Sequence, residues 1–147
     1  MNRFLVFLAD GFEEVEGITV IDYLRRANID VDTVSIKDDP YVKASHNVII
    51  KADKLISEIN LDDYMGLYIP GGTKGAENLR DDDRIIDIVK KFNEDKKIIA
   101  AICAGPIVLN EAGILSDRSC VSFPSIESDL NNIGSYKENE LVVEDKN

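Results

Sequence analysis

The stretch Lys97-Ile-Ile-Ala-Ala-Ile-Cys-Ala-Gly-Pro106 joins a run of apolar residues to an abrupt turn signal. Five apolar residues, enough for a short buried strand, lead directly to Cys103. Two small residues and a proline follow, and proline is favoured in the first turn of a helix. This pattern predicts a strand that ends at the cysteine and turns at once into a helix. A side chain at such a corner lies outside the packed layers and faces a cleft.

Strand and helix patterns alternate along the whole chain. Apolar runs bounded by glycine, proline or polar clusters predict strands at 3–9, 31–36, 47–50, 66–69, 97–102, 120–123 and 141–143. Apolar residues at intervals of three and four predict helices over 10–27, over 81–92, and from the cysteine to Gly113. Because continuously apolar strands alternate with helices, we expect an α/β fold with a mostly parallel sheet and helices on both faces.

The first predicted helix has both a start signal and an apolar stripe. Asp10 and Glu13 have the spacing of a capping pair, which places the beginning of the helix at these residues. The apolar positions of this helix fall on one stripe and are Val15, Ile18, Ile21 and Leu24. The pattern therefore predicts an amphipathic helix directly after the first strand.

Composition limits the classes of protein to which the chain can belong. Its length of 147 residues predicts a single domain over 1–147. The net charge of −11 argues against nucleic acid and anionic membranes as partners, because both attract clustered lysine and arginine. We find no apolar run of the roughly 20 residues that span a bilayer. Two cysteines without CxxC spacing indicate a reducing compartment, so we expect a cytoplasmic protein.

Three unusual segments follow predicted strands, at 9–14, 70–75 and 103–106. The carboxyl ends of parallel strands meet at one edge of a sheet, which is where such folds bind ligands. A cysteine in an apolar run is on its own more typical of a core residue. The corner after the strand, and the helix N-terminus beside it, instead favour a reactive thiolate at Cys103. Cys120 has no such corner and is interpreted as a packing residue.

The glycines of Pro70-Gly71-Gly72 suggest a partner for the cysteine. Their backbone N–H groups, with that of Ala104, could form an oxyanion hole beside the sulfur. The alternative is an ordinary tight turn. The spacing of a phosphate-binding loop is absent, as is GxGxxG after the first strand, so we expect no nucleotide cofactor.

Acidic residues cluster in the first turns of the first helix, at Glu13, Glu14 and Glu16. A protonated carboxyl could donate a hydrogen bond to the sulfur, whereas an ionised one would raise the pKa of the thiol. Spacing alone does not decide which acid faces the cleft. His46 is the only histidine, and its place on a loop favours an exposed, solvated role over partnership with the cysteine.

Four stretches carry a family resemblance: LADGFEEVEG at 8–17, LRRA at 24–27, IPGGTKGAENL at 69–79 and AAICAGP at 100–106. In this combination and order the chain resembles the ThiJ/PfpI family, and within it most closely the parkinsonism-associated deglycase branch. The resemblance implies a flavodoxin-like three-layer sandwich of the class I glutamine amidotransferase type. It also implies a homodimer without a metal or other cofactor.

The resemblance also implies roles for individual residues. Cys103 matches the reactive, oxidisable cysteine at a strained nucleophile elbow. Glu16 matches the carboxyl that bonds this cysteine, and Gly72 and Ala104 match the amides of the oxyanion hole. Family members usually continue past residue 147 by about a strand and a helix. The resemblance therefore implies that a C-terminal strand and helix are missing from this chain.

Other positions match the family or depart from it. Glu13 and Arg26 match positions near the pocket and the dimer surface, and His46 stands where the deglycase branch has an arginine. In the peptidase branch a histidine directly follows the cysteine, where this chain has Ala104. A histidine that often precedes a later proline in the deglycase branch is here Phe123. We therefore expect no Cys–His pair.

Three functional hypotheses follow from these residues. The leading one is a cysteine-dependent stress-response protein that acts on small reactive carbonyls such as methylglyoxal, with Glu16 moving protons. The second is a non-enzymatic redox sensor or chaperone that uses oxidation of Cys103. The third, an intracellular cysteine peptidase or amidase, is disfavoured because no histidine partner is evident.

Overall fold

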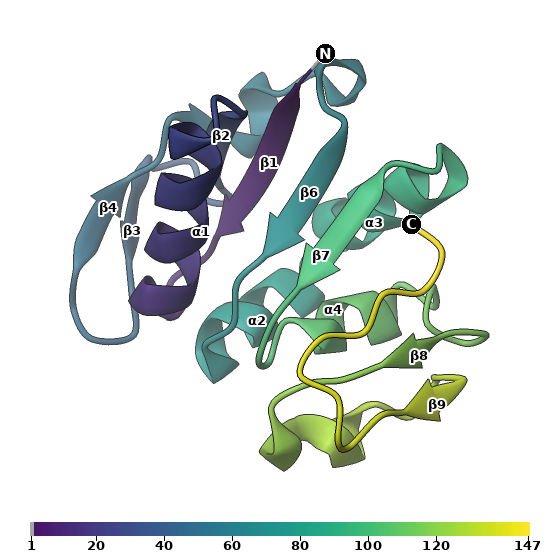
Figure 1. Cartoon of the computed structure of the whole chain (residues 1–147). Helices are drawn as coiled ribbons and strands as arrows, with labels where there is room; N and C mark the ends of the chain where they lie inside the picture. Colours follow the sequence, from purple (N-terminus) through teal and green to yellow (C-terminus); the bar gives the residue numbers. More distant parts are fainter. Residues whose placement is uncertain (1) are drawn as a thin grey trace.

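A computed structural model describes residues 2–147 and shows a sheet between two layers of helices (Figure 1). The five strands of the sheet are parallel and have the order β5-β2-β1-β6-β7. Their bounds are β1 Arg3–Leu8, β2 Asp30–Ser35, β5 Lys54–Leu55, β6 Gly66–Ile69 and β7 Ile98–Ala101. The predicted flavodoxin-like α/β architecture is confirmed.

Alternation along the central strands explains why both faces of the sheet are covered. In β1, Leu5 and Phe7 pack into the larger core, whereas Val6 and Leu8 pack into the smaller one. The larger core lies under α2, α3 and α4, and the smaller one lies under α1 (Figure 1). The bounds of these helices are α1 Glu14–Arg26, α2 Thr73–Arg80, α3 Asp83–Glu94 and α4 Pro106–Glu111.

Short elements complete the fold outside the central sheet. An antiparallel hairpin packs beside α1, and two further strands form a separate parallel pair. The bounds are β3 Tyr41–Lys43, β4 Ile49–Lys51, β8 Ser119–Cys120 and β9 Ser135–Tyr136, with 3-10 helices at Ile56–Glu58, Leu61–Asp63 and Pro124–Asp129. None of the helices within residues 2–147 combines the length and the apolar character needed to cross a membrane.

Three of the predicted strands need correction. The predicted strand 47–50 begins instead at Ile49 and belongs to the hairpin. The predicted strand 120–123 is only the two-residue β8, which pairs with β9 outside the central sheet. The segment 141–143 forms no strand, and Leu141 and Val142 are 97% and 81% exposed. An apolar run becomes a strand only beside a partner, and this run has none among the described residues.

The start and the packing face of α1 also differ from the prediction. Glu13 caps the helix by accepting a bond from the Val15 N–H, while Asp10 accepts one from the Lys43 N–H instead. Of the predicted stripe, Ile21 and Leu24 pack against the core, as does Val20. Val15 and Ile18 are 70% and 40% exposed.

Gly17 explains why α1 packs through a different face from the predicted one. A Cβ atom there would lie 2.8 Å from the Phe12 ring, so only a residue without a side chain lets the helix lie this close to Phe12. The buried face is therefore centred on Gly17 and Val20.

Candidate active site

The cysteine corner is built as the sequence predicts. β7 ends at Ala101, and α4 begins at Pro106. Cys103 lies between them with a φ of 58°, in the left-handed backbone region that residues other than glycine rarely adopt. The Phe123 N–H donates to its carbonyl oxygen at 2.9 Å, which holds the corner from the β8 side. A Cβ at Gly105 would lie 2.8 Å from the Ile69 carbonyl oxygen, so the turn needs glycine there.

The structure brings Glu16 to the sulfur. The Glu16 carboxyl lies beside the Cys103 side chain, and its charge acts on the thiol. Both lie against Gly71, where an added Cβ would collide with Glu16 Oε1 and would lie 3.1 Å from the Cys103 Sγ. Glu16 Oε1 is buried and has no hydrogen-bond partner in residues 2–147. The site therefore holds a buried carboxyl oxygen without a hydrogen-bond partner beside the thiol.

The two predicted amides also converge on this point. The backbone N–H groups of Gly72 and Ala104 lie near the Cys103 sulfur and favour its thiolate form. Gly72 has a φ of 85°, and a Cβ there would lie 2.6 Å from the Glu13 backbone nitrogen. The Glu13 N–H donates to the Gly71 carbonyl at 2.9 Å, which ties the turn after β1 to the turn after β6. Segments from three strand ends thus meet, as predicted.

Burial is the main cause of the pKa shifts of Cys103 and Glu16. Burial, followed by the charge of Glu16, raises the pKa of the Cys103 thiol, although the Gly72 and Ala104 N–H groups oppose the change. Burial likewise raises the pKa of Glu16. We expected the helix N-terminus to favour the thiolate, but desolvation and a neighbouring carboxyl outweigh that effect. Both changes favour the protonated form, so the Cys103 thiol ionises less readily and the Glu16 carboxyl holds a proton more tightly than usual.

Tyr68 belongs to the site and was not predicted from the sequence. Its hydroxyl donates to the Glu16 carbonyl oxygen at 3.0 Å and so holds the first turn of α1 against β6. Burial, followed by the charges of Glu16 and Cys103, raises the pKa of this phenol. Alternation along β6 places Tyr68 on the α1 side, which is the one signal that could have indicated it.

His46 lies apart from the cysteine and binds acids instead. Its Nδ1 lies 3.1 Å from Glu14 Oε2 and 3.6 Å from Glu13 Oε2. The Ser45 hydroxyl donates to the same cluster, 2.9 Å from Glu14 Oε2. Glu13, Glu14 and His46 are the group within residues 2–147 whose ligand atoms, all within 4.8 Å of one another, could hold a metal ion.

Arg26 is not brought to the cysteine. It lies at the opposite end of α1 from Glu16, where its Nε bonds Asp22 at 2.7 Å in an exposed pair. Cys120 is buried in β8, as expected of a packing residue. Both cysteines are free thiols.

A groove of about 1130 Å³ opens beside the sulfur. It is bounded by Glu16, Tyr68, residues 98–103, Phe123 and the tail 138–147. The sulfur thus faces a space much larger than a water molecule, at the carboxyl edge of the sheet.

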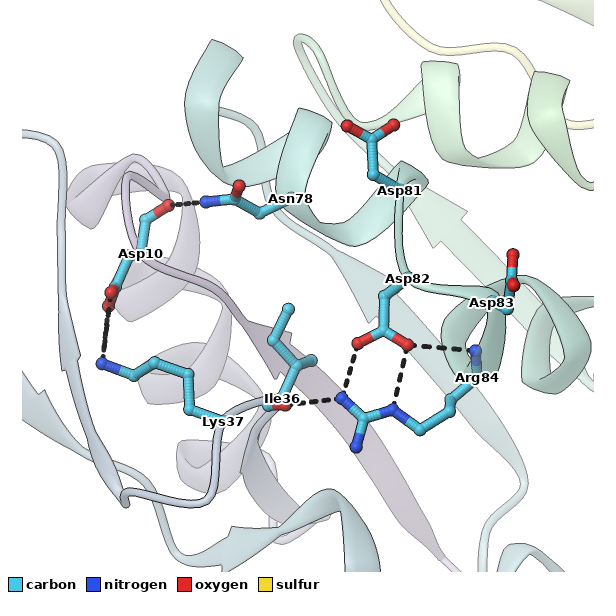
Figure 2. A pocket seen from close by; sticks show the side chains of 8 residues that line it. All are labelled: Asp10, Ile36, Lys37, Asn78, Asp81, Asp82, Asp83 and Arg84. Carbon is cyan, nitrogen blue, oxygen red and sulfur yellow. Dashed lines mark hydrogen bonds and ion pairs between the residues drawn. The ribbon is translucent and has the colours of Figure 1, made fainter.

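A second cavity, of about 610 Å³, lies beyond the ends of β1 and β2 (Figure 2). Its charged groups are already paired with one another. Lys37 bonds Asp10 at 3.0 Å, and the Arg84 guanidinium bonds Asp82 and the Ile36 carbonyl. Since its two cations are satisfied within the protein, this cavity offers little to a ligand.

A family model described as the DJ-1/PfpI family matches residues 2–147. The chain belongs to the DJ-1/PfpI family. This confirms the family that the four sequence stretches indicate, and the match extends over every residue that the structure describes.

Named members of the DJ-1/PfpI family are similar over most of the chain. Protein dj-1beta of Drosophila melanogaster is 36% identical over 97% of this chain and 76% of its own length. A deglycase of Pyrococcus abyssi is 33% identical over 97% of this chain and 85% of its own length. The crystal structure of the Drosophila protein has a TM-score of 0.94, with 99% of this chain and 78% of that chain covered.

Proposed function

We propose that this DJ-1/PfpI protein is a cysteine-dependent enzyme of the glyoxalase or deglycase type, which protects the cell by converting small reactive carbonyls. The observation that carries the proposal is the contact of Cys103 with Glu16, beneath the N–H groups of Gly72 and Ala104. A thiol, a base and two oxyanion donors are sufficient for addition to an aldehyde. The relative from Pyrococcus abyssi that is named a deglycase supports this choice.

The first step is addition of the sulfur to the aldehyde. Glu16 takes the thiol proton as the Cys103 sulfur forms a bond to the aldehyde carbon. The π electrons of the carbonyl move to its oxygen, where the Gly72 and Ala104 N–H groups hold the negative charge. Glu16 returns the proton to this oxygen, which gives a hemithioacetal. The raised pKa of Glu16 suits it to both transfers.

The second step is an internal oxidation and reduction. Glu16 removes the hydrogen of the former aldehyde carbon as a proton and delivers it to the adjacent carbonyl carbon, while the hydroxyl proton of the hemithioacetal passes to the oxygen of that adjacent carbonyl. The first carbon is thereby oxidised to a thioester and the second is reduced to an alcohol, so no external oxidant is needed. Water then hydrolyses the thioester and regenerates the Cys103 thiol. The net reaction converts methylglyoxal and one water into lactic acid.

The proposal includes a homodimer in the cytoplasm. Val15 and Ile18 project from α1, and Val48 and Ile49 are exposed on and beside the neighbouring hairpin. Exposed apolar side chains of this kind favour a partner surface, and a second copy is the simplest partner. The free thiols of both cysteines suit a reducing compartment.

A redox sensor is the second candidate function. Cys103 is partly exposed at its strained corner, and the Glu16 carboxyl could donate a hydrogen bond to a sulfinate. A Toxoplasma gondii DJ-1 whose structure is described as oxidized is 38% identical. The peptidase alternative lacks support because His46, the only histidine, bonds Glu14.

Turnover of methylglyoxal by the purified chain tests the proposal. We expect measurable formation of lactate that Cys103→Ser abolishes, while Cys120→Ser retains it because Cys120 is a buried packing residue. Equal rates for the wild type and Cys103→Ser would contradict the enzyme. Absence of lactate, with mild peroxide adding two oxygens to Cys103 alone, would support the sensor instead.

A further inference from the structure

A histidine, two glutamates and a serine meet where the loop between β3 and β4 touches the start of α1. The His46 Nδ1 lies 3.1 Å from Glu14 Oε2 and 3.6 Å from Glu13 Oε2. The Ser45 Oγ lies 2.9 Å from Glu14 Oε2 and 3.1 Å from Glu13 Oε2. It also lies 3.0 Å from the His46 Nδ1. Neighbouring ligand atoms of a tetrahedral zinc ion lie about 3.3 Å apart, because the bonds are about 2.0–2.1 Å long. The four atoms therefore have separations close to those of a zinc coordination sphere.

Both carboxylates are held so that one oxygen faces this cluster. Glu13 Oε1 accepts a hydrogen bond from the Val15 N–H at 3.3 Å, and Glu14 Oε1 accepts one from the His46 N–H at 2.6 Å. The Oε2 atoms of both residues are thereby left to face Ser45 and the His46 ring. Hydrogen bonds to the second atom of a ligand group orient that group toward a metal. A metal ion would thus find both carboxylates already in place.

The cluster contains too few protons for its own acceptors. The Ser45 hydroxyl carries one proton, and the His46 Nδ1 carries at most one. At most two protons therefore serve the five contacts given above, and some acceptor atoms face each other without one. Within residues 2–147 the ion pairs of Glu13 and Glu14 are both with His46, so two carboxylates share one imidazole. The excess of acceptors and of negative charge favours a cation.

We propose that Glu13, Glu14 and His46 form a binding site for Zn²⁺. The Ser45 hydroxyl lies at the fourth corner of this site. One imidazole with carboxylate oxygens at four-coordinate spacing suits zinc, whereas Ca²⁺ takes about six to eight oxygen ligands and Mg²⁺ requires an octahedron of oxygens. The zinc site goes beyond the proposed function, which uses none of these residues. Its bound ion would join the start of α1 to the loop between β3 and β4.

Titration of the full chain with zinc chloride, followed by calorimetry, measures the binding. The chain carries no affinity tag, and Cys103→Ser with Cys120→Ser removes both thiols as competing ligands. We expect one Zn²⁺ per chain. Addition of Ca²⁺ or Mg²⁺ should not displace it, because the site offers too few oxygens to either ion.

Three variants in this background locate the ion. Glu13→Gln and His46→Arg should each weaken zinc binding at least about tenfold. His46→Arg keeps a positive partner for Glu14, so its loss of binding does not reflect loss of the ion pair that holds the loop. Asp83→Asn is the matched control, because it removes one negative charge from the start of α3 instead, and it should leave the affinity unchanged.

The imidazole of His46 reports the ligand atom directly, because it is the only histidine of the chain. In ¹H–¹⁵N spectra, zinc should shift the Nδ1 resonance and leave Nε2 as the protonated nitrogen. Hydrogen exchange of residues 43–48 should also slow when zinc is added, but not in His46→Arg. Absence of zinc binding, equal binding by all three variants, or an Nδ1 resonance that zinc leaves unchanged would overturn the inference.

Discussion

At the scale of single residues, the site depends on a strained backbone at Cys103. A left-handed conformation costs a side-chain-bearing residue roughly 1–2 kcal/mol, and its φ of 58° shows that Cys103 accepts that cost. The strain is sustained by hydrogen bonds on both sides, from Phe123 to the Cys103 carbonyl and from Gly105 to the Ile102 carbonyl. The result is a sulfur aimed at Glu16 and two amides, out of the sheet.

Gly71 should be intolerant of any side chain. An added Cβ would lie 2.5 Å from the Cys103 Cβ and would also collide with the Glu16 carboxyl. We expect Gly71→Ala to lower methylglyoxal turnover at least tenfold. Gly113→Ala is the matched control, because it introduces strain at a φ of 75° but its Cβ meets nothing closer than 3.9 Å. It should cost about 1 kcal/mol of stability and leave turnover unchanged. Equal activity of the two variants would refute this account of the contact.

The sequence predicted most residues of the site, but it did not predict the raised pKa of the Cys103 thiol. The apolar run and small residues around Cys103 indicated the corner, and the family motifs indicated Glu16. Tyr68 was not predicted because alternation along the short strand β6 gives the face of this tyrosine but not its membership of a site. The raised pKa of the thiol escaped because burial is a property of the packed fold, which the helix-dipole argument does not include.

At the scale of elements, the N-terminus of α1 is tied to the loop between β3 and β4. Glu14 accepts bonds from the His46 N–H and the Ser45 hydroxyl, and it also contacts the His46 ring. Burial opposes ionisation of Glu14, but its own backbone N–H, together with the bonds from His46 and Ser45, outweighs burial and lowers the pKa of Glu14 to about 2. The bond to Glu14, and then its charge, raises the pKa of His46.

The contact of Glu14 with Ser45 and His46, which anchors the loop between β3 and β4 to α1, should weaken at both low and high pH. The His46 contribution is complete below its ordinary pKa of 6.5 and is lost as pH rises through the raised value. The Glu14 contribution is present above 4.5 and is lost as pH falls toward 2. The loop should therefore be held most tightly between these ordinary values.

Hydrogen exchange of the segment 43–48, corrected for intrinsic rates, measures this anchor. Protection should fall as pH rises above 6.5 in the wild type and stay flat in His46→Ala, with peptides of α3 as the internal reference. A flat wild-type profile would contradict the assignment.

Strand prediction succeeded where burial on both faces of the sheet produced a continuous apolar run in the sequence. The strands β1, β6 and β7 are almost wholly apolar and were predicted, and β2 was predicted from its alternation. The strand β5 and the helix α2 have no such apolar pattern and were not predicted. The segment 141–143 is apolar like β1, β6 and β7 but lies outside any ladder. Whether an apolar run pairs depends on what lies beside it in space, which periodicity does not report.

At the scale of the whole molecule, Arg118 fastens the C-terminal tail to the sheet. It is buried, and its Nη2 donates to Asn93 at 2.6 Å and to Asn147 at 2.9 Å. Asn147 in turn accepts a bond from the Ile99 N–H at the edge of β7. Residues 138–147, which bound the groove, are thus held at Asn147 by the buried Arg118 guanidinium and by the edge of β7.

Replacing Arg118 should release this tail. We expect Arg118→Met to lower the free energy of unfolding by about 1–3 kcal/mol, because hydrogen bonds to a charged group are lost. Proteolysis within 138–147 should accelerate, and Arg118→Lys should have an intermediate effect because it keeps the charge but not the fork of donors. Denaturant unfolding and limited proteolysis measure the two effects. Unchanged cleavage of the tail in Arg118→Met would refute the fastening role.

The central claim is that Cys103 and Glu16 act as one acid–base pair. The most direct test is the pH dependence of iodoacetamide labelling at Cys103, in the wild type and in Glu16→Gln, with methylglyoxal turnover measured in parallel. We predict that Glu16→Gln lowers the pKa of the Cys103 thiol, because the negative charge of Glu16 that raises this pKa is removed. Turnover should be lost at the same time, because the proton acceptor is gone. A thiol pKa that is unchanged or higher in Glu16→Gln, or turnover that survives the substitution, would contradict the account.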